Sequence, residues 1–185
     1  MNGIMLATAY LAAVNPPRTR LGMPESAAGG RGRPGVAVLG AASALMAVAA
    51  LAGGSGTILA IVEVTPEMFR VAAGIVVAVA AIATLFRPRP AEEPEASGWR
   101  AALWPVFFPR LLGAEVVALA LATGSTEGAA ASVVAAALAF GLVVVLGAVR
   151  RGRLGDRLLL NTGRLVTVWL MVVAVYLIVD GIRAV

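Results

Sequence analysis

The residues best suited to chemistry lie in an interrupted apolar stretch near the middle of the chain. Pro105, Pro109 and Gly113 follow one another at intervals of four, and Arg110 and Glu115 are charges within the same stretch. Each proline removes a backbone donor and clashes with the preceding turn, so these residues cannot form one regular helix. Unwound backbone exposes carbonyls and a helix N-terminus, which are the groups that hold polar solutes inside a membrane. A kinked helix that packs without a ligand is the alternative.

A second proline break lies near the N-terminus, where Asn15 is followed by Pro16 and Pro17. Two broken segments, one in each half of a chain, indicate a binding site at the interface of two repeats. We therefore predict a substrate site that the two breaks form together near the middle of the membrane. Its expected residues are Asn15, Pro16, Pro105, Pro109, Arg110, Gly113 and Glu115.

Charged residues inside apolar stretches are candidates for binding or for structural support. Arg110 and Glu115 are five residues apart, so a regular helix does not pair them, whereas a break at Gly113 allows a pair. Alternatively, Arg110 extends to the membrane surface. Arg70 and Arg164 each lie about one turn inside an expected helix. We expect both to bond carbonyls of a neighbouring break and so support the fold; the alternative is that they bind an anionic substrate.

The composition identifies the chain as an integral membrane protein. Apolar residues make up 60% of the 185 residues, and the mean hydropathy is +0.92, whereas soluble domains are about 45–50% apolar. Cys and His are absent, which excludes disulfides, thiol catalysis and the usual zinc sites. Because no nucleophile–base pair appears either, we expect no enzyme activity, no cofactor and no metal. Most basic residues lie in loops, where they set membrane orientation rather than bind nucleic acid.

The hydropathy pattern predicts an all-α protein with about six transmembrane helices. They are expected at about residues 3–14, 35–62, 66–86, 101–122, 128–148 and 158–182. The first is short, the first and fourth contain the proline breaks, and the second is expected to bend at residues 53–56. Thr65, Pro66 and Glu67 form a strong helix start, because they combine a cap, a fixed φ and an acid at the positive end of the dipole.

The two halves of the chain resemble each other. Residues 69–80 align with residues 163–174 at an offset of 94, and Pro16 and Pro109 are offset by 93. Three helices in each half require opposite orientations, so we predict one membrane domain with a 3+3 inverted repeat. Its parts are a first repeat at residues 1–86, a polar linker at residues 87–99 and a second repeat at residues 100–185.

Arginines gather in three loops that are expected on one side of the membrane, at residues 18–34, 87–100 and 149–157. The positive-inside rule places these loops in the cytoplasm and both termini outside, in the cell (inner) membrane. Small residues at a spacing of four predict close helix packing on the second and fifth helices. These are Gly40 with Ala44 and Ala137 with Gly141.

Four blocks of the sequence together resemble the MarC family of membrane proteins. Residues 65–74 resemble its Pro-x-x-Phe-Arg-Ile-Ala-Gly-Gly block, and residues 105–113 resemble its Pro-Leu-Ala-Ile-Pro-Leu-Leu-Ala-Gly block. Arg164-Leu165, followed by residues 177–182, resembles its closing Arg-Leu…Leu-Asp-Gly-Ile, and Asn15-Pro16 matches its first Asp/Asn-Pro block. The resemblance covers nearly the whole chain and implies a plan similar to that of the LysE-type exporters. Glu115 departs from the family pattern at the expected site, so no particular substrate is implied.

We expect a small-solute transporter whose partners are the lipid bilayer, a small-molecule substrate, and further copies of the chain or a larger membrane complex. The alternative is a non-transporting accessory subunit of such a complex, a role that the small-residue faces also suit. Purification in mild detergent separates these expectations. A stable homo-oligomer favours the transporter, whereas unrelated subunits in fixed stoichiometry favour the accessory role.

Overall fold

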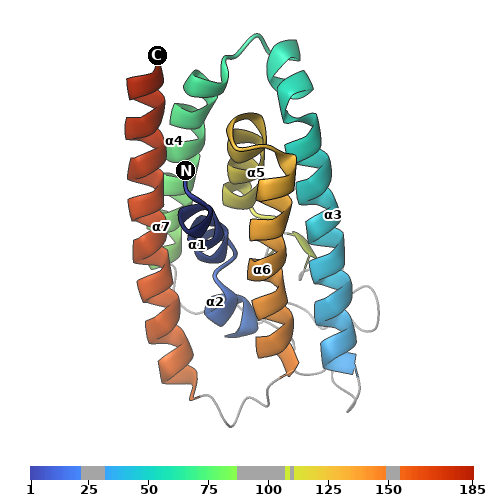
Figure 1. Ribbon diagram of the computed structural model, residues 1–185. Helices are drawn as coiled ribbons and strands as arrows, with labels where there is room; N and C mark the ends of the chain where they lie inside the picture. The colour runs from blue at the N-terminus through green and yellow to red at the C-terminus, as the bar shows by residue number, and fades with distance from the viewer. Residues whose placement is uncertain (22–31, 87–106, 109–110, 149–154) are drawn as a thin grey trace.

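The described part of the structure is built from helices. The computed structural model describes residues 1–21, 32–86, 107–108, 111–148 and 155–185, and it contains no strand among them. The helices are α1 (Gly3–Val14), α2 (Pro16–Leu21), α3 (Gly32–Ile61), α4 (Pro66–Phe86), α5 (Ala114–Thr126), α6 (Ala129–Ala148) and α7 (Asp156–Ala184). The expected all-α fold class is confirmed (Figure 1).

Four of these helices, α3, α4, α6 and α7, are long and apolar enough to cross a membrane. Their apolar segments are Ala37–Ile61, Pro66–Phe86, Ala129–Ala148 and Arg157–Ala184. Helix α5 is also apolar, but its 13 residues are fewer than the roughly 20 that a full span needs. The described helices are those of a multi-pass membrane protein.

Helix α4 has the boundaries that the sequence predicts, Pro66 to Phe86. The Thr65 hydroxyl accepts a hydrogen bond from the Met68 N–H at 3.3 Å, and the Thr65 carbonyl accepts one from the Phe69 N–H at 2.9 Å. Pro66 loses nothing at the first helical position, where its missing N–H has no partner in the helix. This start is therefore fixed by local chemistry.

Helix α3 is continuous through residues 53–56, so the glycines at which a bend is expected do not end it; lipid offers no partner for the peptide groups that a broken helix would release. Residues 18–21, expected in a loop, belong to α2, since prolines are tolerated in the first turn of a helix. Helix α5 begins at Ala114, after a wide turn and an extended glycine; the start of the expected fourth helix, near residue 101, lies outside the described residues.

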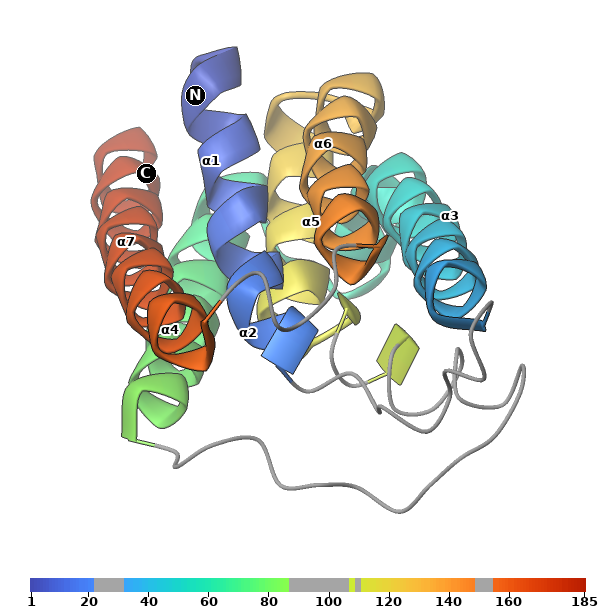
Figure 2. The same ribbon diagram turned by 90° about the horizontal axis from the view of Figure 1, so that it is seen from below.

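The helices form two pairs with α1 and α5 between them. Figure 2 shows α4 beside α7 on one flank and α3 beside α6 on the other. Helices α1 and α2 pack against α6 and α7, whereas α5 packs against α3 and α4. The shared core is rich in small side chains, among them Ala44, Ala81 and Ala136, which let helices approach closely.

Close helix contacts occur at glycines that the sequence pattern did not single out. A Cβ on Gly124 of α5 would lie 2.5 Å from Ala52 Cα of α3. A Cβ on Gly181 of α7 would lie 2.9 Å from the Glu67 carbonyl oxygen of α4. At both positions the missing side chain is what allows two backbones to touch.

One predicted packing face is correct and the other is wrong. Gly40 and Ala44 of α3 are buried as expected. In α6, however, Gly141 is exposed, and a Cβ added there would meet nothing within 4 Å. Helix α6 is apolar on all sides, so the spacing of Ala137 and Gly141 alone does not reveal which face is buried.

Candidate functional site

Helix α1 ends at Asn15, in a break that is buried inside the bundle. Asn15 has a left-handed backbone with a φ of 46°, which asparagine tolerates better than most residues. Its Nδ2 donates to the Gly163 carbonyl at 3.0 Å and to the Thr167 hydroxyl at 2.9 Å. Both partners belong to α7, so the Asn15 amide ties the break to the last helix.

The prolines after Asn15 disturb backbone bonding, and a neighbouring hydroxyl repairs it. In a regular helix the Arg18 N–H would bond the Val14 carbonyl, but here it bonds the Asn15 carbonyl at 3.0 Å. The Thr19 hydroxyl donates to the Val14 carbonyl instead, at 2.8 Å. Because lipid cannot satisfy a freed carbonyl, a proline break at membrane depth needs such a donor.

Two arginines of α2 lie against the bundle, although the sequence predicted both in a cytoplasmic loop. Arg18 Nη1 donates to the Thr84 carbonyl at 2.6 Å, in the last turn of α4. Arg20 is only 2% exposed. A buried arginine is costly in a membrane protein and indicates a structural or functional role. The Asn15 break is thus bonded to α4 as well as to α7. The buried Arg20 side chain is a further polar group beside the break, and the sequence did not predict its burial.

The second break is described only in part. The Leu112 N–H bonds the Phe107 carbonyl, five residues back, at 2.9 Å, as in a π-helix. Gly113 then has extended backbone and directly precedes α5. The Glu115 carboxylate folds back over this glycine: its Oε1 lies 2.6 Å from where a Gly113 Cβ would be. A carboxylate is favourable there because the helix N-terminus carries positive partial charge.

Three of the predicted site residues, Pro105, Pro109 and Arg110, lie outside the described residues. The proposed meeting of the two breaks, and the predicted pairing of Arg110 with Glu115, therefore stay predictions. Pro16 is the first residue of α2 and is buried.

A buried network of hydroxyl groups joins α1, α5 and α6, and the sequence analysis missed it. The Tyr10 hydroxyl lies 3.2 Å from the Thr123 hydroxyl, which lies 2.8 Å from the Ser132 hydroxyl. Thr123 also donates to the Leu119 carbonyl at 2.8 Å. One signal was available in the sequence: a tyrosine in an otherwise apolar segment needs a hydrogen-bond partner when it is buried.

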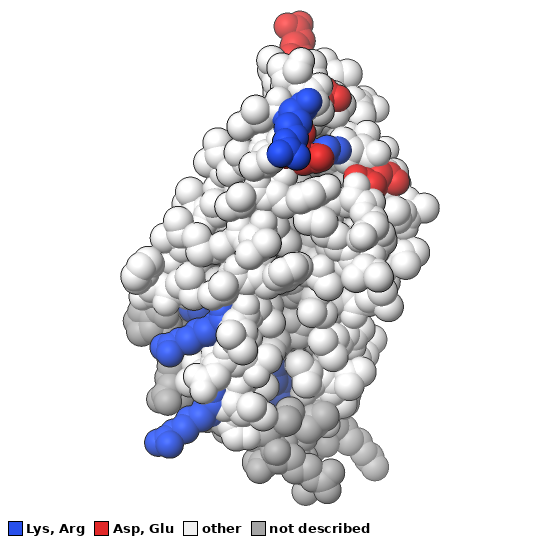
Figure 3. Space-filling view, turned by 60° about the vertical axis from the view of Figure 1, so that its left-hand side comes forward, with Lys and Arg blue, Asp and Glu red and all other residues white. Residues whose placement is uncertain are grey.

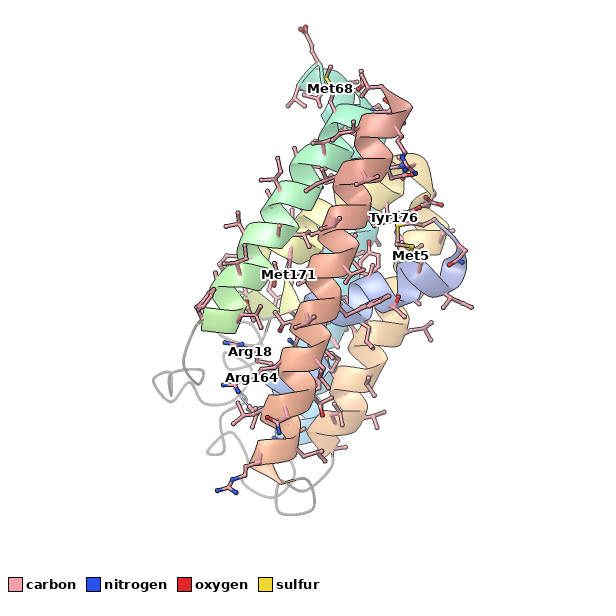
Figure 4. All side chains as sticks on the ribbon, turned by 90° about the vertical axis from the view of Figure 1, so that its left-hand side faces the viewer. Met5, Arg18, Met68, Arg164, Met171 and Tyr176 are labelled. Carbon is pink, nitrogen blue, oxygen red and sulfur yellow. The ribbon has the colours of Figure 1, made fainter. Side chains whose placement is uncertain are left out.

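The two arginines predicted to bond a break have other surroundings. Arg70 of α4 forms an ion pair with Asp180 of α7, with side-chain exposures of 15% and 34%. It links the predicted halves, but through a carboxylate and not through carbonyls of a break. Arg164 is exposed and makes no hydrogen bond or ion pair with the described residues. Figure 4 shows Arg164 and Arg18 at the same end of α7.

Within the part of the chain that the structure describes, no three His, Cys, Asp or Glu side chains gather as a metal site would require. What the described site offers is hydrogen bonding: an amide, hydroxyls and guanidinium groups inside an apolar bundle. Such groups can hold a polar solute or fix a broken helix, and they provide no nucleophile with an adjacent base.

We predict that the Arg70–Asp180 pair contributes to stability. Asp180→Ala should lower the free energy of unfolding by about 1–2 kcal/mol, because it leaves a partly buried guanidinium without its partner. Exchanging the two residues (Arg70→Asp with Asp180→Arg) should restore part of the loss. Unfolding in mixed micelles with increasing SDS measures this. Arg183→Ala is the control, since Arg183 is exposed on the same helix end, and equal losses from Asp180→Ala and Arg183→Ala would contradict the prediction.

The comparisons with known proteins identify a family whose model covers most of the chain. A family model described as MarC family integral membrane protein matches residues 36–185. Neither a curated protein nor a solved structure matches the chain. The matched range contains nearly all of α3 and the whole of α4 to α7, including Gly163 and Thr167, and it leaves α1 and α2 outside.

Proposed function

Because the chain belongs to the MarC family of integral membrane proteins, we propose that it moves a small polar solute across the cell membrane. The observation that carries the proposal is the buried polar break at Asn15. Three polar residues of this break are between 2% and 7% exposed inside a bundle of apolar helices: Asn15, Thr19 and Arg20. Buried polar groups are costly inside a membrane, and they are the kind of group that lines a solute pathway.

The solute site in this proposal lies where the two broken segments face each other. Asn15 and Pro16 supply one side, and Gly113 and Glu115 belong to the segment that supplies the other. In many transporters, half-helix ends and unwound carbonyls near the membrane centre hold the substrate. The extended backbone at Gly113 and the left-handed backbone at Asn15 are features of that kind. The buried hydroxyls of Tyr10, Thr123 and Ser132 extend the polar interior on the α5 side.

The inverted repeat is part of the proposal, and the packing of the helices supports it. If α3 corresponds to α6 and α4 to α7, each of these helices is paired with its own counterpart. The segment after the first break, α2, packs against α6 and α7; the segment after the second, α5, packs against α3 and α4. The segment after each break therefore packs mainly against the long helices of the other half, as a two-fold relation between the halves would place it.

We predict that both termini lie outside the cell and that the arginine-rich loops lie inside. The chain has no cysteine, so single cysteines can be labelled without background. Val185→Cys, at a residue that is 80% exposed, should react with a membrane-impermeant maleimide in intact cells. Ser97→Cys should react only after the cells are permeabilised. Labelling of Ser97→Cys in intact cells would show the opposite orientation.

The transport proposal is tested by comparing the solutes that cells release. Cells that overproduce the protein are compared with cells that overproduce Thr167→Val, which removes one hydrogen bond of the break, or Arg157→Gln, an exposed control. We expect at least one small polar metabolite to accumulate in the medium with the wild type and the control and less with Thr167→Val. The same compound should then exchange across proteoliposomes that contain the purified protein.

Two results would count against this function. One is an unchanged set of released solutes while the protein is folded and abundant in the membrane. The other is purification in mild detergent with unrelated subunits in fixed stoichiometry, which would support the role of an accessory subunit.

A further inference from the structure

Arg164 occupies an unusual position for a charged residue. It lies about two turns inside α7, within the apolar segment Arg157–Ala184 that is able to cross a membrane. It is exposed and has no partner among the described residues. A guanidinium on the lipid-facing side of a spanning helix needs an anion or water near the membrane surface.

The register between α4 and α7 shows which residue faces Arg164. The helices are antiparallel: Gly74 packs against Ala174 and Ile178, and Arg70 pairs with Asp180. Continuing this register along the pair brings the last residue of α4, Phe86, to the level of Arg164. Phe86 is 84% exposed.

The internal repeat of the sequence also relates Phe86 to the position of the acidic partner. The offset of 94 that relates Arg70 to Arg164 also relates Phe86 to Asp180. At one end of the α4–α7 pair the arginine therefore has a carboxylate partner, and at the other end a phenyl ring occupies the equivalent place. The place that corresponds to the acidic partner is thus occupied by an apolar residue at Arg164.

A second arginine lies beside it. The Arg18 Cβ is 3.6 Å from where a Cβ on Gly163 would lie, so α2 touches α7 directly next to Arg164. Figure 4 shows the two arginines close together near the lower end of α7. On the face that Figure 3 shows, the red acidic side chains lie at the opposite end of the molecule from the lower blue ones.

We propose that Arg164, assisted by the charge of Arg18, binds the phosphate of an anionic phospholipid at this end of the α4–α7 pair. Guanidinium groups bind phosphate oxygens through two parallel hydrogen bonds, which makes arginine suited to a headgroup. A lipid is the expected source of the phosphate because Arg164 is exposed on the flank of an apolar spanning helix and not inside the bundle. Arg164 is not among the residues proposed to hold the solute, so lipid binding to it is tested separately from transport.

The experiment measures lipid binding to the purified protein in neutral detergent by native mass spectrometry. Phosphatidylglycerol and phosphatidylcholine are titrated separately. We expect the wild type to bind phosphatidylglycerol more tightly, and Arg164→Gln to weaken that binding about tenfold. Arg157→Gln is the matched control, because Arg157 is an exposed arginine on the same helix about two turns earlier; its effect should stay below about twofold.

A variant that supplies Arg164 with an acidic partner provides a second test. Phe86→Glu places a carboxylate opposite Arg164 in the register that Arg70 and Asp180 already use. We expect it to pair with Arg164 and reduce phosphatidylglycerol binding as far as Arg164→Gln does, while the protein stays folded, because Phe86 is exposed.

Three outcomes would overturn the proposal. Equal losses from Arg157→Gln and Arg164→Gln would show unspecific attraction between charges. Equal binding of phosphatidylglycerol and phosphatidylcholine would show that the phosphate charge is not selected. Displacement of the lipid by millimolar inorganic phosphate would show a site for a soluble anion instead of a headgroup.

Discussion

Gly124→Ala is expected to destabilise the protein by roughly 3 kcal/mol or more. A Cβ at this position would lie 2.5 Å from Ala52 Cα and 2.6 Å from the Ala52 carbonyl oxygen. Both atoms belong to the backbone of α3, so no side-chain rotation can relieve the overlap. The two helices would have to separate, and α5 would lose the close contact that holds this half-length helix in place. Close backbone approach is a main source of stability between helices in lipid, where burial of apolar surface gives little.

The glycines of the chain provide a graded series for this measurement. Gly74→Ala should cost less than Gly124→Ala, because the closest backbone atom that its Cβ would meet, the Ala174 carbonyl oxygen, is 2.9 Å away, and the 2.6 Å contact is with a side-chain atom, the Ile178 Cγ1. Gly141→Ala should be neutral or slightly stabilising, since it meets nothing within 4 Å and alanine favours the helix by up to about 1 kcal/mol. Thermal unfolding followed by size-exclusion chromatography in detergent ranks the three. A Gly124→Ala protein that melts with the wild type would show that α5 and α3 do not touch as described.

The helix boundaries and the buried helix faces show how much of the fold the sequence could predict. Helix α4 was placed correctly because Thr65, Pro66 and Glu67 fix its start through interactions within one turn. The long spans were visible because a spanning helix must be apolar over its whole length. The identity of the buried face was not visible at α6, where apolar residues surround the helix and Gly141 turned out to be exposed. In a soluble helix a polar face would have shown which side is outside.

The candidate site was predictable only where a residue type has a strong backbone effect. The prolines after Asn15 indicated a broken helix, because proline has no backbone N–H to donate within a helix. The partners that make the break tolerable, Thr19 and Thr167, gave no signal, because a single threonine in an apolar segment fits a helix equally well without such a role. Arg20 lies inside the bundle because a short helix, α2, begins at the two prolines. The basic, proline- and glycine-rich composition of this segment suggested a loop instead.

The second large effect is expected at Asn15, where backbone shape and hydrogen bonding can be separated. Asn15→Gly keeps the left-handed backbone but removes the amide that donates to the Gly163 carbonyl and the Thr167 hydroxyl. We expect a loss of about 2–3 kcal/mol, because buried polar groups of α7 lose a donor that lipid cannot replace. Asn15→Ala should lose about 1 kcal/mol more, since alanine pays the steric cost of a positive φ that glycine avoids.

A double-mutant cycle with Thr167→Val identifies the origin of the loss. The Asn15 Nδ2 and the Thr167 hydroxyl are 2.9 Å apart, so the effects of Asn15→Gly and Thr167→Val should not add, with a coupling of roughly 0.5–3 kcal/mol. Unfolding in SDS-containing mixed micelles gives each term. Additive effects would mean that the amide does not hold α1 to α7 through this hydroxyl. If the Asn15→Gly protein remains folded at physiological temperature and also stops releasing the solute that the wild type releases, the amide serves the pathway as well as the fold. Continued release at the wild-type rate would restrict Asn15 to fixing the break.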